Sequence, residues 1–371
     1  MRVLVTGGAG FIGSHLVDTL LAHGHAVRVL DSLEPQVHGP AAKRPAYLHA
    51  GAELQVGDVR DREAVRRALD GVEVVFHQAA AVGVGQSMYE IERYVSVNSL
   101  GAAVLLEELV ERRKQLRRVV VASSMSIYGE GAYRDASGAL VAPRLRPAAQ
   151  LAARRFELED AAGRPLAPAP TAESKPLQPT SVYAVTKRDH EELFLSVGDA
   201  YAIPTVALRY FNAYGTRQSL SNPYTGVMAI FSSRLLNGNA PLVFEDGGQS
   251  RDFVHVSDIV AANLLAVERE AAVGGVFNVG TGRATSVLEI GRLLARELGL
   301  AIEPEISGRF RAGDIRHCIA DPSAAARDLG FEARTALADG MRELLAWLRT
   351  QAPEDRVDGA RAELEARGLT R

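Results

Sequence analysis

The stretch RVLVTGGAGFIGSHLV (residues 2–17) constrains the fold more than any other part of this 371-residue chain. A short valine-rich run, typical of a buried strand, leads directly into a glycine-rich loop, and the loop opens an amphipathic helix. Gly7, Gly10 and Gly13 give the spacing G-x-x-G-x-x-G. A tight turn, the close approach of a backbone to a pyrophosphate, and a helix packed hard on a strand each require a missing side chain. The stretch therefore predicts the first strand–helix unit of a dinucleotide-binding fold.

The same alternation of strands and helices continues to about residue 125. Further apolar runs at 26–30, 52–58, 72–78 and 117–124 are typical of buried strands, with helix candidates such as 13–23, 61–70 and 98–113 between them. Alternation of this kind indicates βαβ units and a parallel sheet. Because the chain exceeds the roughly 250–300 residues at which a single core stops growing, we expect two lobes. The predicted fold class is α/β: a Rossmann-type doubly wound parallel sheet with a smaller α/β substrate lobe.

An acidic residue stands where such a fold contacts the adenosine ribose. Asp31 ends the second predicted strand, 18 residues after Gly13. Its carboxylate would bond the ribose hydroxyls and would repel a 2′-phosphate, so the sequence favours NAD over NADP. After the third strand, GDV fits an adenine contact. The candidate cofactor residues of this region are Gly7, Gly10, Phe11, Ile12, Gly13, Asp31, Asp58 and Val59.

Bulk composition excludes several other classes of protein. The formal net charge is −3, and no basic run points to nucleic acid or to an anionic membrane surface. No apolar stretch approaches the length of a membrane span. Cys318 is the single cysteine, which argues against disulfides and cysteine-based metal sites, and the histidines show no metal-ligand spacing, so no metal is expected. We expect a cytoplasmic enzyme.

Two later stretches carry the chemistry. The fifth strand ends in VVVASSMSIYG, and ligands of open α/β sheets bind beyond the carboxyl ends of the strands. A serine there, Ser123 or Ser124, would face a substrate hydroxyl. In SVYAVTK (181–187), Tyr183 and Lys187 lie one helical turn apart on one face. By itself this pair fits either a lysine that lowers the pKa of a catalytic tyrosine or an ordinary solvated helix face.

Taken in order, the glycine loop, SSMSIYG and YAVTK resemble the extended short-chain dehydrogenase/reductase family, in particular its nucleotide-sugar epimerase/dehydratase branch. The similarity continues through RYFNAYG (209–215), RDFVHVSD (251–258) and RAGD (311–314). It covers nearly the whole chain outside 130–178, an Ala-, Pro- and Arg-rich excursion that could be an ordered element beside the site or a disordered loop.

The resemblance implies a role for each matching residue. Tyr183 would be the catalytic acid/base, Lys187 its electrostatic partner and a ligand of the nicotinamide ribose, and Ser124 a hydroxyl donor. A tyrosine acting as a base near pH 7 needs a pKa shift of roughly three units, about 4 kcal/mol, which Lys187 and oxidised nicotinamide together could supply. The remaining residues that the resemblance implies are Ala79, Ala80, Ala81 and Asn98 for the cofactor, and Ser126, Asn212, Arg251, Arg311 and Asp314 for the sugar nucleotide.

The residues after Ser124 discriminate between the reactions of the family. Its 4,6-dehydratases carry Asp-Glu there, and its decarboxylating members carry a glutamate at the second position. This chain has Met125 and Ser126, so we predict an NAD-dependent 4-epimerase that passes through a 4-keto intermediate. The substrate expected first is dTDP-L-rhamnose, and a UDP-hexose or UDP-uronate is the alternative. Two alternatives belong to other functional classes. One is a nucleotide-sugar reductase or dehydrogenase with net redox chemistry, and the other is a non-catalytic redox-sensing Rossmann protein.

The expected domain organisation follows from the same order of motifs along the chain. We expect an NAD-binding domain at 1–180, joined by 181–212 and about 251–280 and interrupted by 130–178; a nucleotide-sugar lobe at 213–250 and 281–350; and a charged, helical, solvated tail at 351–371. Helices 94–113 and 181–201 carry wider apolar faces than one sheet contact needs. In the family such helices form a four-helix bundle, so a homodimer is expected.

Overall fold

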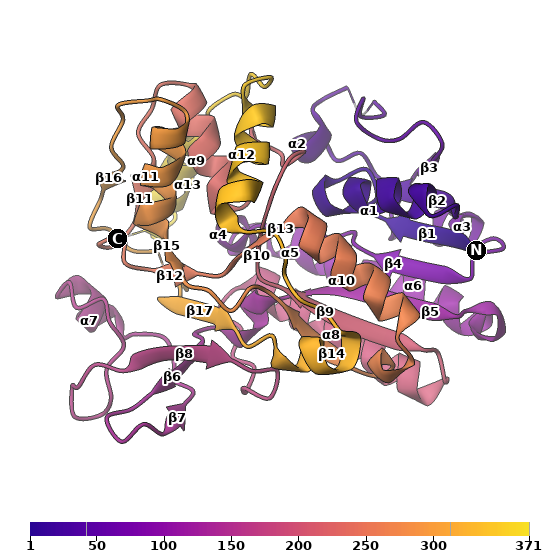
Figure 1. Cartoon of the computed structure of the whole chain (residues 1–371), viewed down its shortest axis with the longest axis horizontal. Coiled ribbons are helices and arrows are strands. Elements are labelled where there is room, and N and C mark those ends of the chain that lie inside the picture. Colours follow the sequence, from indigo (N-terminus) through magenta and orange to yellow (C-terminus); the bar gives the residue numbers. More distant parts are fainter. Residues whose placement is uncertain (42, 312, 371) are drawn as a thin grey trace.

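A parallel sheet of seven strands forms the centre of the computed structural model, which describes residues 1–41, 43–311 and 313–370 (Figure 1). The strand order is β14-β9-β5-β4-β1-β2-β3, so the chain reverses direction across the sheet between β1 and β4, as in doubly wound folds. The strands are β1 (Arg2–Thr6), β2 (Ala26–Asp31), β3 (Glu53–Val56), β4 (Val74–His77), β5 (Arg118–Ser124), β9 (Thr205–Tyr210) and β14 (Val276–Val279).

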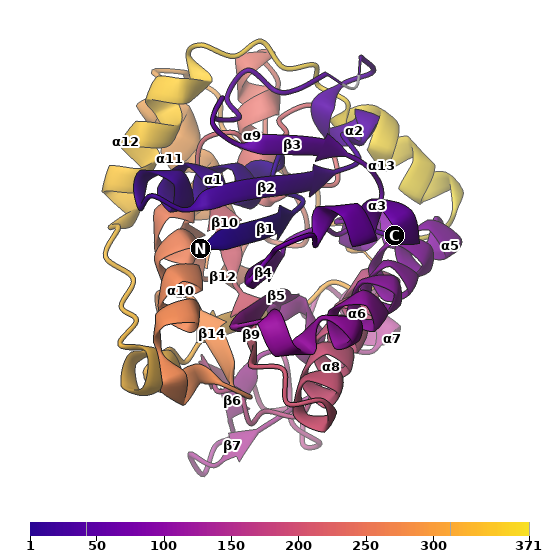
Figure 2. The ribbon, with the colours of Figure 1, turned by 90° about the vertical axis from the view of Figure 1, so that its right-hand side faces the viewer.

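Helices cover both faces of this sheet (Figure 2). On one face lie α1 (Phe11–Ala22) and α10 (Val256–Glu268); on the other lie α3 (Arg62–Ala68), α6 (Gly101–Glu111) and α8 (Val182–Ala200). Alternation along the strands supplies both cores: in β1, Val3 and Val5 pack toward α1 while Leu4 packs toward α3 and α6. Sheets buried on both faces need such continuous apolar strands. The predicted α/β class with a Rossmann-type sheet is confirmed.

The 130–178 excursion is ordered and belongs to a second, mixed sheet. It contributes β6 (Ala132–Arg134), β7 (Leu140–Val141), the short helix α7 (Ala148–Ala152) and β8 (Ala167–Thr171). The strand order is β15-β12-β17-β8-β6-β7, in which β12 (Ser250–Arg251), β15 (Thr285–Ser286) and β17 (His317–Ala320) come from the carboxyl half of the chain. The excursion is therefore joined to the region that the sequence assigns to the sugar nucleotide.

The remaining core lies among helices of the carboxyl half. Phe231 in α9 (Val227–Leu236), Leu294 in α11 (Val287–Glu297) and Leu345 in α12 (Leu337–Leu348) share one cluster. Two short parallel pairs flank it: β10 (Asn212–Tyr214) with β13 (Phe253–His255), and β11 (Leu242–Val243) with β16 (Glu305–Ile306).

Short elements complete the described chain. They are α2 (Pro35–His38), α4 (Val84–Ser87), α5 (Ile91–Tyr94), the π-helices η1 (Val95–Leu100) and η5 (Ala325–Leu329), and the 3₁₀ helices η2 (Arg113–Gln115), η3 (Met125–Tyr128) and η4 (Glu270–Ala272).

The tail forms α13 (Val357–Ala366) as expected, but it is less solvated than expected. Leu364 is buried against Gly85, and the Arg367 guanidinium lies 4.4 Å from the centre of the Tyr89 ring. Leu364 is the only buried residue of this helix, so one apolar side chain anchors it. No helix in the described ranges is both long enough and apolar enough to cross a bilayer.

Candidate active site

The glycine loop between β1 and α1 has the geometry that a pyrophosphate requires. Gly7 adopts a φ of +69°, and a Cβ there would lie 2.7 Å from the Ala79 nitrogen. A Cβ at Gly13 would collide with the Gly7 carbonyl and stand 2.7 Å from Gly8 Cα. Each collision is with backbone, which cannot give way. The loop therefore keeps an open backbone surface at the amino end of α1, where N–H groups favour an anion, so it fits a dinucleotide.

Asp31 ends β2 beside this loop. Its Oδ2 accepts the Ala9 N–H at 2.9 Å, and its Oδ1 accepts the Leu33 N–H at 2.9 Å. The Tyr47 hydroxyl donates to the Ala9 carbonyl at 2.9 Å. The carboxylate expected to bind the adenosine ribose is thus fixed to the loop expected to bind the pyrophosphate. Phe11 and Ile12 open α1 directly after that loop.

The residues predicted near adenine are engaged with protein groups. The Asp58 carboxylate holds the Arg60 guanidinium through bonds of 2.9 and 2.6 Å, and this pairing lowers the pKa of Asp58. Val59 is buried in the core beneath α3 and α6.

Asn98 connects the segment after β4 with α8. Its Oδ1 accepts the Ala81 N–H at 2.8 Å, and its Nδ2 donates to the Ala81 carbonyl at 3.1 Å and to the Thr186 hydroxyl at 2.9 Å. Ala79 and Ala80 complete the same segment after β4. Asn98 lies in η1, and such π-turns inside helices occur often at functional sites because they re-aim side chains.

Tyr183 is in the first turn of α8, capped by the Ser181 hydroxyl, which accepts the Ala184 N–H at 3.1 Å. The Ser87 hydroxyl accepts the Tyr183 N–H at 3.0 Å, and the Tyr94 ring meets the Tyr183 ring edge-on at 6.4 Å. Burial raises the pKa of Tyr183, and the Ser124 hydroxyl opposes this by hydrogen bonding to the phenol. The structure therefore brings Ser124 and Tyr183 together, as the sequence predicts.

Ser124 is oriented by the residue that follows Met125. The Ser126 hydroxyl and the Ser126 N–H both donate to Ser124 Oγ, at 2.9 and 3.2 Å. With its oxygen accepting twice, Ser124 keeps its own O–H for the phenol or a substrate. Met125 is buried in the core, so neither position after Ser124 offers an acid.

Lys187 follows Tyr183 by one turn and is almost wholly enclosed. Its side chain reaches the Ala122 carbonyl on β5 and lies 3.3 Å from His190 Nδ1. Burial lowers the pKa of Lys187 to about 7, and the charge of Glu191 opposes that shift. Glu191 is itself held by Arg209 Nε at 2.9 Å and by the Ser123 hydroxyl at 2.7 Å.

The residues expected to bind the sugar nucleotide form a second group. The Arg251 guanidinium donates to the carbonyls of Ser250, Ile315 and Arg316 at 2.8–2.9 Å, which places it at the residues just before β17. Nearby in the sequence, Arg311 Nε donates to Asp314 Oδ2 at 2.7 Å, and the Arg311 guanidinium covers the Phe244 ring at 4.7 Å.

Asn212 belongs to the same group. It donates its N–H to the carbonyl of Asp252, the neighbour of Arg251. Its side-chain Oδ1 is buried, and within the described residues it has no partner.

Sequence reasoning missed His190, Ser87 and Tyr94. His190 is three residues after Lys187, and the i,i+3 spacing that relates one helical turn was the available signal. Ser87 and Tyr94 come from segments far from residue 183 in the sequence, so residue spacing gave no signal for them.

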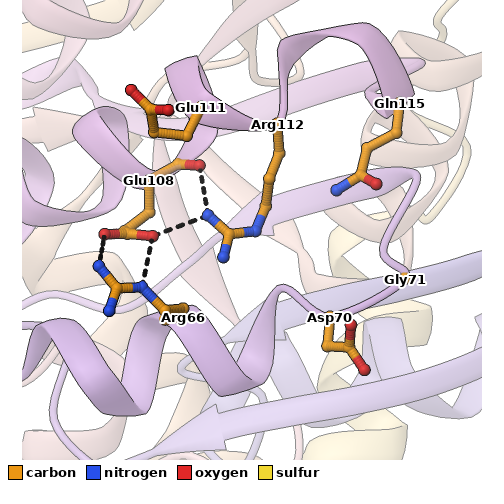
Figure 3. Close-up of a pocket in the computed structure, with 7 residues that line it drawn as sticks. All are labelled: Arg66, Asp70, Gly71, Glu108, Glu111, Arg112 and Gln115. Carbon is orange, nitrogen blue, oxygen red and sulfur yellow. Dashed lines mark hydrogen bonds and ion pairs between the residues drawn. The ribbon is translucent and has the colours of Figure 1, made fainter.

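A pocket of about 450 Å³ lies away from these residues, between α3 and α6 (Figure 3). The Glu108 carboxylate is held there by Arg66 and by Arg112, and Figure 3 shows the three side chains converging. Its lining is Arg66, Asp70, Gly71, Glu108, Glu111, Arg112 and Gln115. The two arginines of the lining are thus both paired with Glu108, and the pocket presents an ion-pair surface. Within the described ranges, no group of three His, Cys, Asp or Glu side chains could hold a metal.

Comparison with known proteins agrees with this geometry. Residues 3–280 match the model of the NAD dependent epimerase/dehydratase family, and the chain belongs to that family. It is 38% identical over 349 residues to dTDP-L-rhamnose 4-epimerase of Burkholderia thailandensis, covering 94% of each chain. UDP-glucose 4-epimerase of Thermus thermophilus in complex with NAD is 31% identical with a TM-score of 0.75, covering 95% of this chain and 100% of the other. UDP-glucuronic acid 4-epimerase of Bacillus cereus, in complex with UDP-glucuronic acid and NAD, has a TM-score of 0.77 at 26% identity, with coverage of 94% and 99%.

Proposed function

We propose that this protein is an NAD-dependent nucleotide-sugar 4-epimerase. The observation that carries the proposal is the group at the end of β5: the Ser124 hydroxyl bonds the Tyr183 phenol, Lys187 reaches the Ala122 carbonyl one turn further along α8, and Asn98 ties α8 to the segment after β4. When bound, NAD supplies an acceptor for the hydride of the sugar carbon and returns that hydride to the other face of the ketone. The protein's own task is to move the hydroxyl proton and to hold the groups in place.

Tyr183 would take the proton from the C4 hydroxyl and give it back. Burial alone works against this because it raises the pKa of the phenol. Three features favour the phenolate: the Ser124 hydroxyl, the Lys187 side chain when protonated, and the position of Tyr183 in the first turn of a long helix, where the helix dipole stabilises a negative charge. A shift of three units corresponds to about 4 kcal/mol, which several such contributions together can reach.

Elimination of water is disfavoured by the residues after Ser124. Dehydration across C5 and C6 needs a proton donor and a base near those carbons. Met125 packs in the core, and Ser126 directs its hydroxyl to Ser124. Epimerisation needs neither group, so the site suits it better.

For the substrate we propose dTDP-L-rhamnose first and a UDP-hexose or UDP-uronate second. The relative from Burkholderia thailandensis supports the first. Asn212, Arg251, Arg311 and Asp314 are the residues we assign to the sugar nucleotide. A guanidinium can bind a diphosphate through paired hydrogen bonds, and Arg251 retains its Nε–H for such a contact.

In the proposed domain organisation the two lobes interleave along the chain. Residues 1–180, interrupted by the 130–178 excursion, would bind NAD together with 181–212 and about 251–280, and 213–250 with 281–350 would bind the sugar nucleotide. The cytoplasm is the proposed location.

Proton NMR of the purified protein with a panel of dTDP- and UDP-sugars, without added cofactor, tests the proposal. Conversion of one sugar to equilibrium with its C4 epimer would support both the epimerase and retained NAD. Conversion only with stoichiometric NADH or NAD⁺ would replace the epimerase with a reductase or dehydrogenase.

We also propose a homodimer formed by a second copy on the α5–η1–α8 face. Ile91, Val95, Leu100 and Val185 are between 44% and 53% exposed, and they stand on elements that pack against one another. Apolar groups gathered in this way favour burial by a partner. Light scattering should give a dimer mass for the wild type and a monomer mass for Val185→Asp. A wild-type monomer would overturn the assignment.

A further inference from the structure

His190 is a buried histidine that the proposed reaction does not use. It lies on α8 with no exposed surface, and its Nε2 is 2.5 Å from the Asn98 carbonyl oxygen. A carbonyl oxygen only accepts, so Nε2 carries the proton. Burial, together with the charge of Lys187, keeps the pKa of His190 well below its ordinary value, so the ring is neutral. Its Nδ1 is therefore a bare acceptor.

That bare nitrogen faces the lysine. Lys187 Nζ lies 3.3 Å from His190 Nδ1 and also donates to the Ala122 carbonyl. An ammonium group has three N–H donors in tetrahedral arrangement. Once two of these N–H bonds point at their acceptors, the direction of the third N–H bond is set, and the ammonium group can no longer rotate.

We propose that His190 is a positioning residue: with the Ala122 carbonyl it holds the Lys187 ammonium so that one N–H remains for the cofactor ribose and Tyr183. This inference rests on the proposed function. It assigns to His190 no contact with substrate, and it predicts that the residue acts only through Lys187.

The groups around Lys187 show why the His190 Nδ1 acceptor matters for the protonated form of the lysine. The titratable groups that face it are Tyr183, His190 and Glu191 on its own helix and His77 at the end of β4. Glu191 is held by Arg209 and Ser123, and burial lowers the pKa of His77 to about 3, so that ring is neutral. From β5 the neutral Ala122 carbonyl approaches Lys187, and the neutral Asn98 carbonyl of η1 approaches His190. The lone pair of His190 is therefore one of the two neutral acceptors on the ammonium, beside the Ala122 carbonyl.

Lysine titration tests the inference directly in the NAD-loaded protein. The chain contains only four lysines, at 43, 114, 175 and 187, so ¹⁵N-lysine NMR gives few signals, and Lys→Arg variants assign them. His190→Phe keeps a planar ring but removes the acceptor; His190→Asn places an amide oxygen near the position of Nδ1. We expect the Lys187 titration to move down by about one pH unit in His190→Phe and to stay near the wild-type value in His190→Asn.

Kinetics give the second readout. His190→Phe should lower kcat about 10- to 100-fold and move the basic limb of the pH profile to lower pH, with KM for the sugar nucleotide little changed. His190→Asn should recover most of kcat. His77→Phe removes a second buried histidine near Lys187, which bonds the Thr6 hydroxyl at 2.8 Å, and should leave the limbs of the profile in place.

The outcomes separate the possible failures. An unmoved Lys187 titration in His190→Phe, or equal losses in the Phe and Asn variants with equal losses in Tm, would overturn the positioning role. If the wild type epimerises no sugar, the proposed function fails, and the NMR titration still decides the role of His190.

Discussion

Lys187→Met gives a prediction whose sign and size follow from burial. The lysine is 3% exposed, and its pKa falls from the ordinary 10.5 to about 7 because the folded protein desolvates its charge. Between those two pH values the unfolded chain holds a proton that the folded chain lacks. Stability should therefore rise with pH there, by about 1.4 kcal/mol per pH unit.

The sign is opposite to that of a lysine held in an ion pair. Below pH 7 the folded protein bears the full cost of burying the ammonium, roughly 5 kcal/mol for the whole shift. That cost disappears as the pH rises from 7 toward 10.5. Methionine has no such cost at any pH, although it leaves the Ala122 carbonyl and His190 Nδ1 without their donor, which subtracts a pH-independent amount.

The quantity to measure is the difference in the free energy of unfolding between the wild type and Lys187→Met, and how that difference changes with pH. Urea denaturation would be carried out at pH 7 and at pH 9.5 on protein freed of dinucleotide. From pH 7 to pH 9.5 the free energy of unfolding of the wild type should rise by about 3 kcal/mol relative to that of Lys187→Met. The exposed Lys114, replaced in the same way, controls for the loss of a lysine. If the difference between wild type and Lys187→Met stays the same at both pH values, the argument from desolvation is refuted.

Three further variants test other parts of the site. Tyr183→Phe should abolish turnover while the purified protein still carries NAD, checked by NMR assay and by chromatography of the released dinucleotide; retained turnover would contradict its acid/base role. Gly13→Ala places a Cβ against the loop backbone and should reduce NAD content to near zero, whereas normal content would show that the loop is not the pyrophosphate site. Arg209→Met leaves buried Glu191 unpaired and should cost about 3–5 kcal/mol in urea denaturation, and adding Glu191→Met should recover part of it; no recovery would mean that packing, not charge, sets the loss.

The central sheet and the helix α8 were predictable because their determinants are local. Valine-rich runs bounded by small or polar residues predicted five of the strands, and the glycine loop required a strand before it and a helix after it. Tyr183 and Lys187 meet because helical spacing alone brings them together. The same rule would have drawn attention to His190, had its position been read against Lys187.

The excursion was not predictable for equally physical reasons. Its strand β8 has the sequence APAPT, in which Pro168 and Pro170 argue against a strand between two neighbours. It nevertheless pairs with β6 on one side and with β17, about 150 residues away, on the other. Prolines leave ladder donors missing, and the pairing survives because distant strands supply the remaining contacts. Tertiary context here overrides propensity.

Buried polar atoms connect that excursion to the helix α8. Arg209, which holds Glu191 on α8, also donates to the Tyr128 hydroxyl at 2.8 Å and to the Glu173 carbonyl at 3.0 Å. Tyr128 donates in turn to Asn278 Oδ1 at 2.7 Å, and the Asn278 amide donates to the Thr171 carbonyl of β8 at 2.8 Å. Because each of these groups is costly to bury alone, the network is stable only when its members are all in place. A change in the excursion that displaces β8 should therefore also disturb the position of α8, although no residue of the excursion is assigned a role in the proposed reaction.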